Sequence, residues 1–537
     1  MARFPNMPGN SSYMPRLLPL RLPRVCVAIT APTPAEMLEK AEAIVRDNPF
    51  IELRLDYLRQ PASVFQKLRR FADYHPESLV IATCRRAANG GKFRGSISAQ
   101  VEVLVKAAAS GGQFIDLELE SAAALKSKDL DRLRAAAAVI LSFHDFRATR
   151  KVEETFQKMT AIPADFYKVV STAKSLYDNV VMMKFLERQS QKHSMIGLCM
   201  GEQGIISRVL CVRAGSVFTF ASAAPGEETA PGQIAARTLH DVYRIDQVDA
   251  ATKVYGVAGD PVAHSLSPLM MNTAFRRENV NGVYLALHAT KISDLLACVR
   301  DIPLHGLSIT MPYKQEIISH LDKTDAITEK IGACNTVIRA QDGNLYGYNT
   351  DVAGVVRPLE QRLHLAGAKV LVVGAGGAAR AAVFGLKERG AEVFIMNRTT
   401  SVGQKLARQA RAKFLSRIQM RGLQFDVIVN ATPIGMGGAK ASPLSDSELN
   451  ARILFEMVYT PAETKLVKMA RAKGMQVITG TEMFVQQGAR QFEIWTGKPA
   501  PADDMYRVVM AALQNRAANP GHTTTRRANL GPPAALA

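Results

Sequence analysis

Short hydrophobic runs alternate with amphipathic stretches along the first half of the chain. Each run is brief, continuous and rich in β-branched or aromatic residues, which is typical of a strand buried on both faces of a parallel sheet. The runs are Val25–Thr30, Phe50–Leu55, Leu79–Thr83, Phe114–Leu119, Val139–Phe143, Phe166–Ser171, Met195–Met200 and Val217–Ala221. The stretches between them have helical spacing and include Ala35–Arg46, Ser63–Tyr74, Ser98–Ala109 and Thr172–Lys192.

Eight such repeats between residues 24 and 247 predict an α/β fold of the (β/α)8 barrel type. An open, doubly wound sheet with fewer strands is the alternative, because periodicity alone miscounts short runs. In a barrel, reactive residues lie at the carboxyl ends of the strands. The barrel interpretation therefore predicts where functional side chains gather.

Ionisable and polar residues interrupt these apolar runs or follow them at once. A charged group inside a buried strand is costly unless it is paired or functional. Such residues occur on or after seven of the predicted strands, which indicates a shared site at one end of the barrel. They are Glu52, Arg54, Arg85, Asp116, Glu118, His144, Lys168, Arg208, Thr229 and Gln233.

Lys168 is the most informative of these residues, because it lies within the apolar run Phe166–Ser171. Desolvation disfavours a charged ammonium and so favours a nucleophilic amine that attacks a carbonyl group. His144 follows the preceding strand and is the candidate proton shuttle. A lysine that extends to solvent from a strand end, and a structural histidine, are the alternatives.

The second half contains an apolar strand, Lys369–Val373, followed by a glycine-rich turn and a helical pattern from Arg380. The turn has G-x-G-x-x-A spacing, which is typical of a dinucleotide-binding βα unit with free helix N–H groups facing a pyrophosphate. The candidate cofactor-binding residues of the turn are Gly374, Ala375, Gly376, Gly377 and Ala378. A βα turn that merely requires glycine is the alternative.

The end of the next strand, Glu392–Met396, indicates which dinucleotide is bound. Asn397, Arg398 and Thr399 follow that strand, where an NAD-preferring site usually has an acidic residue for the ribose 2′-hydroxyl. A guanidinium can pair with a 2′-phosphate and stack on an adenine. The sequence therefore predicts NADP as the cofactor, with a solvated surface arginine as the alternative.

Further polar residues lie at turns between residues 253 and 364. Ser265 and Ser267 precede a helix, where hydroxyls can cap the helix or bind a polyol. Lys314 and Asp351 could form a proton-transfer pair, but spacing alone fits a surface ion pair equally well. Thr310 and Asn335 are candidate ligands from neighbouring turns.

Composition narrows the class of protein. The chain has 537 residues, which suggests two or three domains, and a formal net charge of +19. The basic residues are scattered, so we expect anionic metabolites rather than nucleic acid as partners. The six cysteines are far apart and show no metal-ligand spacing, so we expect no metal and a cytoplasmic location. No apolar run is long enough to span a membrane, so we expect no membrane association, and oligomeric state stays open.

Residues 24–247 resemble type I 3-dehydroquinate dehydratase, through Ile51–Tyr57, Ser142–Phe146, the Lys168 strand, Ile206–Arg208 and Thr229–Gln233. The resemblance implies a Schiff base on Lys168, with His144 as its proton-transfer partner. It also implies that the substrate is held by Glu52, Arg54, Arg85, Arg208, Thr229 and Gln233. The sequence departs from the family at Thr229, where Ser is usual, and at Asn89, where Glu is usual.

Residues 253–517 resemble shikimate dehydrogenase, through Ser265–Ser267, Thr310–Lys314, Asn349–Asp351, the Gly374 turn and Asn430–Met436. The resemblance implies Lys314 and Asp351 as the catalytic pair. It implies that shikimate is bound by Ser265, Ser267, Thr310, Asn335, Tyr459 and Gln487, and that NADP is also bound by Thr432 and Gly480. Ser308 stands where the family often has Asn.

Together the halves predict a bifunctional shikimate-pathway enzyme that dehydrates 3-dehydroquinate and reduces 3-dehydroshikimate with NADPH. The alternatives are a chain with only one active half, a second half that is a quinate dehydrogenase, and a regulatory or nucleic-acid-binding protein on retired enzyme folds. The expected divisions are a disordered leader (1–23), the barrel (24–247), a substrate domain (253–364), a Rossmann domain (365–478), returning helices (479–517) and a disordered tail (518–537).

Overall fold

The computed structural model describes residues 21–263, 265–302, 304–438 and 441–518. The expected disordered leader and tail therefore lie outside the described residues, except for their innermost positions. The chain forms two compact units, one of residues 1–253 with 287–303 and the other of residues 254–286 with 304–537. Within the described parts, no helix combines the length and the apolar character needed to cross a membrane.

The first unit is built on parallel strands that pair in sequential order, which confirms the barrel expectation. In its described part the principal strands number eight, namely β1 (Val25–Ile29), β2 (Phe50–Arg54), β3 (Leu79–Thr83), β4 (Phe114–Glu118), β5 (Ala138–His144), β6 (Phe166–Thr172), β7 (Met195–Met200) and β8 (Thr219–Ser222). A short strand, β9 (Ile234–Ala235), pairs with β8. The amide of Val217, just before β8, donates to the carbonyl of Met195 on β7 at 2.8 Å, which links the two ends of the sequence of strands.

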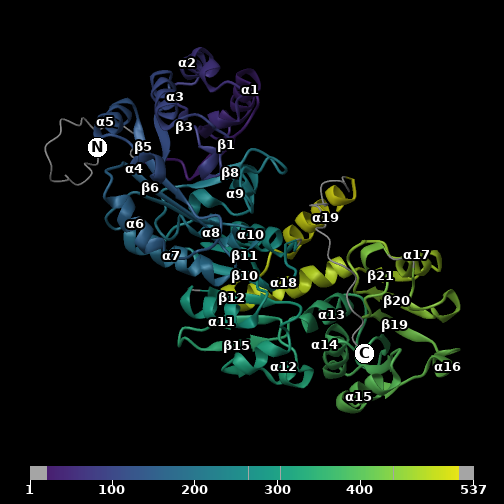
Figure 1. Ribbon diagram of the computed structural model, residues 1–537. Helices are drawn as coiled ribbons and strands as arrows, with labels where there is room; N and C mark the ends of the chain where they lie inside the picture. Colours follow the sequence, from purple (N-terminus) through teal and green to yellow (C-terminus); the bar gives the residue numbers. More distant parts are fainter. Residues whose placement is uncertain (1–20, 264, 303, 439–440, 519–537) are drawn as a thin grey trace. The chain divides into compact units, whose positions relative to one another are not determined.

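Helices of the first unit lie around these strands (Figure 1). They are α1 (Pro34–Val45), α2 (Phe65–Tyr74), α3 (Ile97–Ala109), α4 (Leu119–Ala123), α5 (Ser127–Ala136), α6 (Val152–Thr160), α7 (Tyr177–Gln189), α8 (Ile205–Leu210) and α9 (Ala236–Asp241), while α11 (Ile292–Asp301) packs on the outer side of α7. The helix expected at Thr172–Lys192 begins only at Tyr177, because β6 continues through Thr172. Tyr177 and Lys184 of α7 both contact the Asp301 carboxylate of α11.

The barrel interior is filled in layers by side chains from alternate strands, as closed barrels require. Near the amino ends, Phe50, Phe114, Phe166 and Phe218 contact one another, with ring centroids 4.7 to 5.8 Å apart. Because strand side chains repeat every second residue, the next inward positions on the same strands form the layer above. Those positions are Glu52, Asp116, Lys168 and Phe220. An apolar floor therefore lies beneath a layer that is mostly ionisable.

The second unit begins with a mixed sheet in the order β11-β10-β12-β14-β15-β13. Its strands are β10 (Lys253–Gly259), β11 (Gly282–His288), β12 (Leu304–Ile309), β13 (Lys323–Thr324), β14 (Thr336–Arg339) and β15 (Leu345–Tyr348). Its helices are α10 (Ser267–Arg277), α12 (Ala326–Ile331) and α13 (Asp351–Glu360). The last helices, α18 (Gly480–Thr496) and α19 (Ala502–Ala518), share a core with β10 and α10 through residues such as Phe275, Phe492 and Met505.

The remaining sheet is parallel, with strand order β18-β17-β16-β19-β20-β21. This is the order of a dinucleotide-binding fold, as the sequence predicts. The strands are β16 (Lys369–Val373), β17 (Glu392–Met396), β18 (Lys413–Phe414), β19 (Phe425–Asn430), β20 (Ala451–Glu456) and β21 (Gln476–Ile478). The helices are α14 (Gly377–Glu388), α15 (Thr400–Ala410), α16 (Arg417–Met420) and α17 (Lys465–Ala472). Apolar clusters on each face hold sheet and helices together.

Candidate active sites

A pocket opens at the carboxyl ends of the barrel strands, and eight of the ten residues predicted for the first half line it, while Asp116 and Glu118 do not. The predicted lining residues are Glu52, Arg54, Arg85, His144, Lys168, Arg208, Thr229 and Gln233. The pocket also has apolar walls, formed by Phe146, Val170, Leu198, Met200 and Phe220. A site that combines charged and hydroxyl-binding groups with apolar walls suits a small polyhydroxylated acid.

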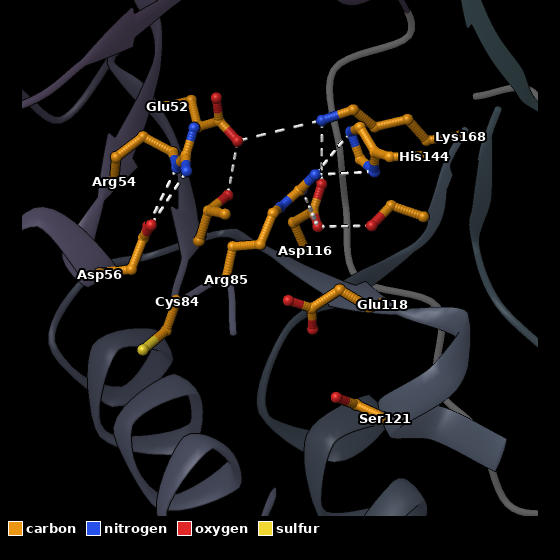
Figure 2. A network of polar contacts seen from close by, with 12 residues as sticks. Glu52, Arg54, Asp56, Cys84, Arg85, Asp116, Glu118, Ser121, His144 and Lys168 are labelled. Atoms are coloured by element: carbon orange, nitrogen blue, oxygen red, sulfur yellow. Dashed lines mark hydrogen bonds and ion pairs between the residues drawn. The ribbon is translucent and has the colours of Figure 1, made fainter. Parts of the chain in front are cut away.

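Lys168 is buried, with 4% of its surface exposed, but its ammonium does not lie in apolar surroundings. Its Nζ lies 3.0 Å from Asp116 Oδ2 and 4.0 Å from Glu52 Oε1 (Figure 2). It also lies 3.8 Å from the centre of the Phe220 ring. The sequence-based expectation of an amine surrounded by apolar groups is therefore wrong, because the neighbouring strands β2 and β4 supply carboxylates that the run around Lys168 does not reveal.

Arg85 connects Asp116 with His144. Its Nη2 donates to Asp116 Oδ1 at 2.7 Å, and its Nη1 lies 2.7 Å from His144 Nδ1. Burial, and then the positive charge of Arg85, hold the pKa of His144 well below its ordinary value. Arg85 and Lys168 outweigh burial and keep the pKa of Asp116 far below its usual range. His144 is therefore a neutral base beside an ionised carboxylate.

Arg208 has the properties of an anion receptor. It is 1% exposed, and within the described residues no carboxylate contacts it. Its Nη2 donates to the carbonyl of Pro231 at 3.0 Å, while its Nε is buried without a hydrogen-bond partner. Burial lowers the pKa of Arg208 to about 10. A buried guanidinium with free donors fits the carboxylate of an acidic ligand.

The other predicted residues of the pocket are held by local contacts. Arg54 makes two parallel bonds to Asp56, at 3.0 and 2.9 Å, which fix its guanidinium. Gln233 Oε1 accepts from both the amide and the hydroxyl of Thr229, which fixes the side chain of this lining residue. Asn89 precedes the lining residue Gly90, but no hydrogen bond joins Asn89 to His144 in the described part of the chain.

Several residues that organise this site receive no role from sequence reasoning. Asp116 and Glu118 are recognisable as charges on one side of a strand, which is the available signal, but that pattern does not assign Asp116 a function. Asp56 and Ser142 give no signal, since an acid after a strand and a serine within one are common. Ser142 donates to Asp116 Oδ1 at 2.7 Å. Burial raises the pKa of Glu118 despite the nearby Arg85.

In the second unit, Lys314 and Asp351 form an ion pair of 2.7 Å between Nζ and Oδ2. Asn335 donates from Nδ2 to Asp351 Oδ1 at 2.9 Å and is itself buried. Its Oδ1 accepts from the amide of Thr350 at 2.8 Å, which orients the carboxamide. Because the Asp351 side chain is nearly buried, this pair is not the exposed surface ion pair that the sequence left as an alternative.

The other predicted ligands of this unit are placed without a direct hydrogen bond to Lys314 or Asp351 in the described residues. Ser265 Oγ accepts from the amide of Ser267, and Thr310 follows β12 with its amide bonded to Ala258. Tyr459 stacks on Phe484 with ring centroids 5.5 Å apart, and Gln487 donates to the Phe484 carbonyl at 2.9 Å. Ser308 Oγ donates to Gln491 Oε1 at 2.7 Å, a contact the sequence does not indicate.

The glycine-rich turn after β16 leaves room for a phosphate group. Gly374 has φ of +118°, and a Cβ there would lie 2.9 Å from the carbonyl oxygen of Ala431, so a side chain is excluded. An added Cβ at Gly376 or Gly377 would meet nothing within 4 Å. Ala375 and Ala378 complete the turn. The N-terminus of α14 therefore faces open space, which fits a pyrophosphate.

The residues predicted to contact the rest of a dinucleotide lie at the ends of β17, β19 and β21. Arg398 is exposed and has no acidic partner among the described residues, while Asn397 donates to the Thr399 carbonyl at 2.9 Å. Thr432 donates to Asn430 Oδ1 at 2.7 Å. A Cβ at Gly480 would lie 2.6 Å from the carbonyl oxygen of Met457, so the chain passes too closely there for a side chain. An exposed, unpaired arginine at this strand end fits a 2′-phosphate.

Comparisons with family models agree with this division of the chain. Residues 25–250 match the model of type I 3-dehydroquinase. Residues 257–337 match the shikimate dehydrogenase substrate binding domain, and residues 358–435 match shikimate / quinate 5-dehydrogenase. Residues 480–510 match the shikimate 5′-dehydrogenase C-terminal domain.

Similar proteins include both fused and separate enzymes. The chain is 33% identical over 510 residues to the chloroplastic bifunctional 3-dehydroquinate dehydratase/shikimate dehydrogenase of Arabidopsis thaliana, covering 90% of this chain and 84% of that one. It is 39% identical over 257 residues to shikimate dehydrogenase (NADP(+)) of Syntrophobacter fumaroxidans, covering 47% of this chain and 89% of that one. The crystal structure of shikimate 5-dehydrogenase from Thermus thermophilus with NADP(H) and shikimate has 34% sequence identity and a TM-score of 0.46, covering 48% of this chain and 99% of that one.

Proposed function

The chain belongs to the family of bifunctional 3-dehydroquinate dehydratase/shikimate dehydrogenases, and from this premise we propose which residues carry out each reaction. The chain converts 3-dehydroquinate to 3-dehydroshikimate and reduces that product to shikimate with NADPH. The first reaction belongs to the barrel pocket and the second to the other unit. The observation that carries the assignment is the buried lysine of the barrel, which lies in a pocket with a neutral histidine and an arginine free of acidic partners among the described residues.

In the barrel, Lys168 Nζ attacks the substrate ketone and forms an imine, while the ketone oxygen leaves as water. Lys168 must first lose the proton that its ion pair with Asp116 holds, and neutral His144 is the acceptor. His144 returns this proton to the ketone oxygen as that oxygen leaves as water, and the neutral His144 then removes a proton from the carbon next to the imine carbon. It passes this second proton to the neighbouring hydroxyl group, which leaves as water. Hydrolysis of the imine consumes one water, so the net reaction releases a single water.

The charges of the pocket match an acid with one negative charge. Arg54 is paired with Asp56, and Arg85 and Lys168 face Asp116 and Glu52. Arg208 then remains as the surplus positive charge, so we propose that it binds the substrate carboxylate. Glu52, Arg54, Arg85, Thr229 and Gln233 hold the ring hydroxyls and the carboxylate from the other sides.

In the second unit, Lys314 and Asp351 act as the proton-transfer pair at the carbonyl oxygen that is reduced. Asn335 orients Asp351, and Ser265, Ser267, Thr310, Tyr459 and Gln487 bind the substrate. NADPH, when bound, supplies the hydride. The turn from Gly374 to Ala378 would hold its pyrophosphate, Asn397, Arg398 and Thr399 its adenosine phosphate, and Thr432 and Gly480 its remaining part.

Reductive trapping tests the first assignment. Borohydride reduces an imine to a stable secondary amine, so treatment during turnover of dehydroquinate should inactivate the dehydratase irreversibly. Mass spectrometry should place the added mass on the peptide that contains Lys168. The matched control is Lys184→Arg, on the outer helix α7, which should be trapped like the natural chain. An adduct on another residue, or none, contradicts the imine.

A coupled assay tests the two reactions in one chain. When purified protein is given dehydroquinate and NADPH, the absorbance of NADPH should fall at the rate at which shikimate appears. Loss of substrate without NADPH oxidation would favour the alternative in which only one half is active. Quinate tested as a second alcohol separates a shikimate dehydrogenase from a quinate dehydrogenase, and the hydroxyl pair Ser265 and Ser267 favours shikimate.

We also propose a cytoplasmic location and the domain division 24–247, 253–364, 365–478 and 479–517. All six cysteines are buried and unbonded, which is usual in a reducing compartment. Burial raises the pKa of the Cys199 and Cys334 thiols to about 11, so these thiols are unreactive at neutral pH. We propose small anionic metabolites, and not nucleic acid or membrane, as the partners.

A further inference from the structure

The loop between β3 and α3 carries Arg85 into the pocket and is closed on itself by backbone hydrogen bonds. The amide of Ala87 donates to the carbonyl of Phe93 at 2.8 Å, and the amide of Phe93 donates to the carbonyl of Arg85 at 3.0 Å. The amide of Gly91 donates to the carbonyl of Arg86 at 3.0 Å. The loop of residues 85–93 is therefore a closed unit whose placement decides where the Arg85 side chain lies.

Buried carboxylates hold each end of this loop by a backbone amide. At one end, the amide of Arg86 donates to Glu118 Oε1 at 2.8 Å. At the other end, the amide of Lys92 donates to Asp56 Oδ2 at 3.1 Å. Asp56 is already paired with Arg54. Glu118 has no such ion pair in the described residues, so its contact with Arg86 stands out.

Glu118 lies beside the pocket but does not line it. It is 1% exposed, and its Oε2 accepts from Gln100 Nε2 at 2.6 Å. Gln100 in turn donates to the carbonyl of Cys84 and accepts from Ser121 Oγ. In Figure 2 Glu118 is drawn apart from the group formed by Arg85, His144 and Lys168, and no dashed line joins it to them. Gln100 of α3 thus holds the Glu118 carboxyl in place, and the carboxyl in turn holds the loop through the Arg86 amide.

An apolar side chain at this position would avoid the desolvation cost of a buried carboxyl. A buried carboxyl loses its hydration and here gains no counter-ion in direct contact among the described residues, so hydrogen bonds alone offset that cost. Its specific contribution is directional, because an oxygen acceptor fixes the Arg86 amide in a way that an apolar group cannot. Arg86 is the residue directly after Arg85, so a fixed amide there also fixes the direction in which Arg85 leaves the backbone.

We propose that Glu118 is a positioning residue of the dehydratase, which acts through the Arg86 amide to hold Arg85 against His144 and Asp116. The inference rests on the proposed function of the barrel pocket. Without Glu118 the loop keeps its internal bonds but loses its attachment to the barrel at the Arg86 end. Arg85 then spends less time between His144 and Asp116, and the pocket is less often in its reactive arrangement.

Hydrogen exchange and steady-state kinetics on the full chain test the proposal with Glu118→Gln. The carboxamide that replaces the carboxylate can offer one oxygen but must face Arg86 or Gln100 with an NH2 group, so one contact is lost. Amides of residues 85–93 should exchange faster, and dehydratase kcat/KM should fall about tenfold, the effect of one hydrogen bond. Shikimate oxidation by the same sample reports the concentration of the chain, and a melting curve reports the folding of the barrel.

Asp165→Asn is the matched control. Asp165 Oδ2 also accepts a backbone amide, that of Val139 at 2.8 Å, but at the amino ends of β5 and β6. This variant should leave dehydratase kcat/KM within about twofold, since the contact lies away from the pocket. Glu118→Leu leaves the buried donors of Arg86 and Gln100 without an acceptor, so it should lower the melting temperature of the barrel and lower dehydratase kcat/KM at least as far as Glu118→Gln. A loss of activity in Glu118→Gln that only follows the fraction of unfolded barrel, with unchanged exchange of residues 85–93 in the folded protein, would show a merely structural role.

A double-mutant cycle with Arg85→Lys separates positioning from direct action. If Glu118 acts through Arg85, Glu118→Gln should cost much less in the Arg85→Lys background than in the natural chain. Equal costs in both backgrounds, or unchanged exchange of residues 85–93, would overturn the proposal. A borohydride adduct on Lys168 in the natural chain keeps the two questions apart, because its absence contradicts the proposed function and not the role of Glu118.

Discussion

Two arginines without acidic partners among the described residues show how burial separates their roles. Arg208 is buried and hydrogen-bonded to the Pro231 carbonyl, so its charge is available to an anion that enters the pocket. Arg398 is exposed at the end of β17, where its side chain is free to fold over a bound nucleotide. In the proposed assignment, the buried Arg208 binds a carboxylate and the exposed, long side chain of Arg398 binds a phosphate.

We expect Arg398→Ala to raise KM for NADPH far more than KM for NADH. Loss of a charge-assisted contact to the 2′-phosphate costs about 1.5–3 kcal/mol, which is roughly ten- to a hundredfold in KM. Initial rates of 3-dehydroshikimate reduction with each cofactor measure the difference. Arg421→Ala, another exposed arginine of the same unit, should change neither constant. Equal effects of Arg398→Ala on both cofactors would mean that Arg398 does not contact the 2′-phosphate.

The protonation of His144 makes a second prediction. Because burial and Arg85 lower its pKa, His144 stays neutral, and thus able to accept a proton, at pH values below the ordinary histidine range. Dehydratase kcat/KM should therefore begin to fall at a lower pH than it would with a histidine of ordinary pKa. Asn89→Glu would place a carboxylate near the imidazolium and favour it, so the acid limb of the pH profile should move to higher pH.

The dehydrogenase profile of the Asn89→Glu variant serves as its control and should not change. An acid limb that stays in place, or moves to lower pH, would mean that position 89 does not neighbour His144. No hydrogen bond joins Asn89 to His144 in the described residues, so the prediction depends on the reach of the longer glutamate side chain.

At the scale of elements, paired layers on alternate strands build the barrel site. Phenylalanines near the amino ends of β2, β4, β6 and β8 form the floor. The residues two positions later on the same strands are Glu52, Asp116, Lys168 and Phe220. Because side chains on a strand point to the same face every second residue, the ionisable groups form the layer directly above the phenylalanines. This closely packed apolar layer limits the movement of Lys168 and its partners.

The turn after β16 gives a prediction about backbone space. Gly376→Ala should leave the fold intact, since its φ of −78° is ordinary and a Cβ there meets nothing within 4 Å. The same methyl group projects toward the space assigned to the pyrophosphate, so KM for NADPH should rise about tenfold or more. Dissociation constants from fluorescence titration and melting curves test the two statements separately.

Gly374→Ala is the companion variant with the opposite expectation. Its φ of +118° and the Ala431 carbonyl at 2.9 Å make a side chain strained whatever ligand is present. The free energy of unfolding of the second unit should fall by about 1 kcal/mol or more, and its melting temperature should fall accordingly. A destabilised Gly376→Ala, or a Gly374→Ala that melts like the natural chain, would contradict this account of the turn.

Much of this arrangement is predictable from the sequence. The eight strand runs, the Gly374 turn and the polar residues at strand ends follow from local periodicity, which is a property of neighbouring residues. Contacts between strands are different, because they depend on register and rotamers. For that reason the sequence does not reveal Asp116 as the partner of both Arg85 and Lys168. The same holds for the hydrogen bonds that join Ser308 to Tyr284 and Gln491.

At the scale of the whole molecule, the two units have separate hydrophobic cores. The barrel core is centred on residues such as Phe114 and Phe166, and the cores of the second unit on residues such as Phe275 and Val372. Because the cores are distinct, we expect a polar substitution in one site to leave the packing of the other site unchanged. The two activities should therefore respond independently to mutation.

We expect Asp351→Asn or Lys314→Ala to abolish shikimate oxidation, by a factor of about 10² or more, and to leave dehydratase turnover unchanged. Lys168→Ala should do the reverse. Both activities are measured on one preparation, so each serves as the concentration standard for the other. A folded variant that loses both activities would show that the units depend on each other.

The ion pair between Lys168 and Asp116 has a consequence for the life of the enzyme among other metabolites. Cells contain sugars, aldehydes and pyridoxal derivatives, all of which condense with free amines. An ammonium has no lone pair with which to attack them, so a lysine kept in an ion pair is shielded from stray adducts. In the proposed assignment, a ligand whose carboxylate binds Arg208 settles beside His144 and takes the place of this ion pair. We therefore expect Asp116 to limit adduct formation on Lys168 by other carbonyl compounds.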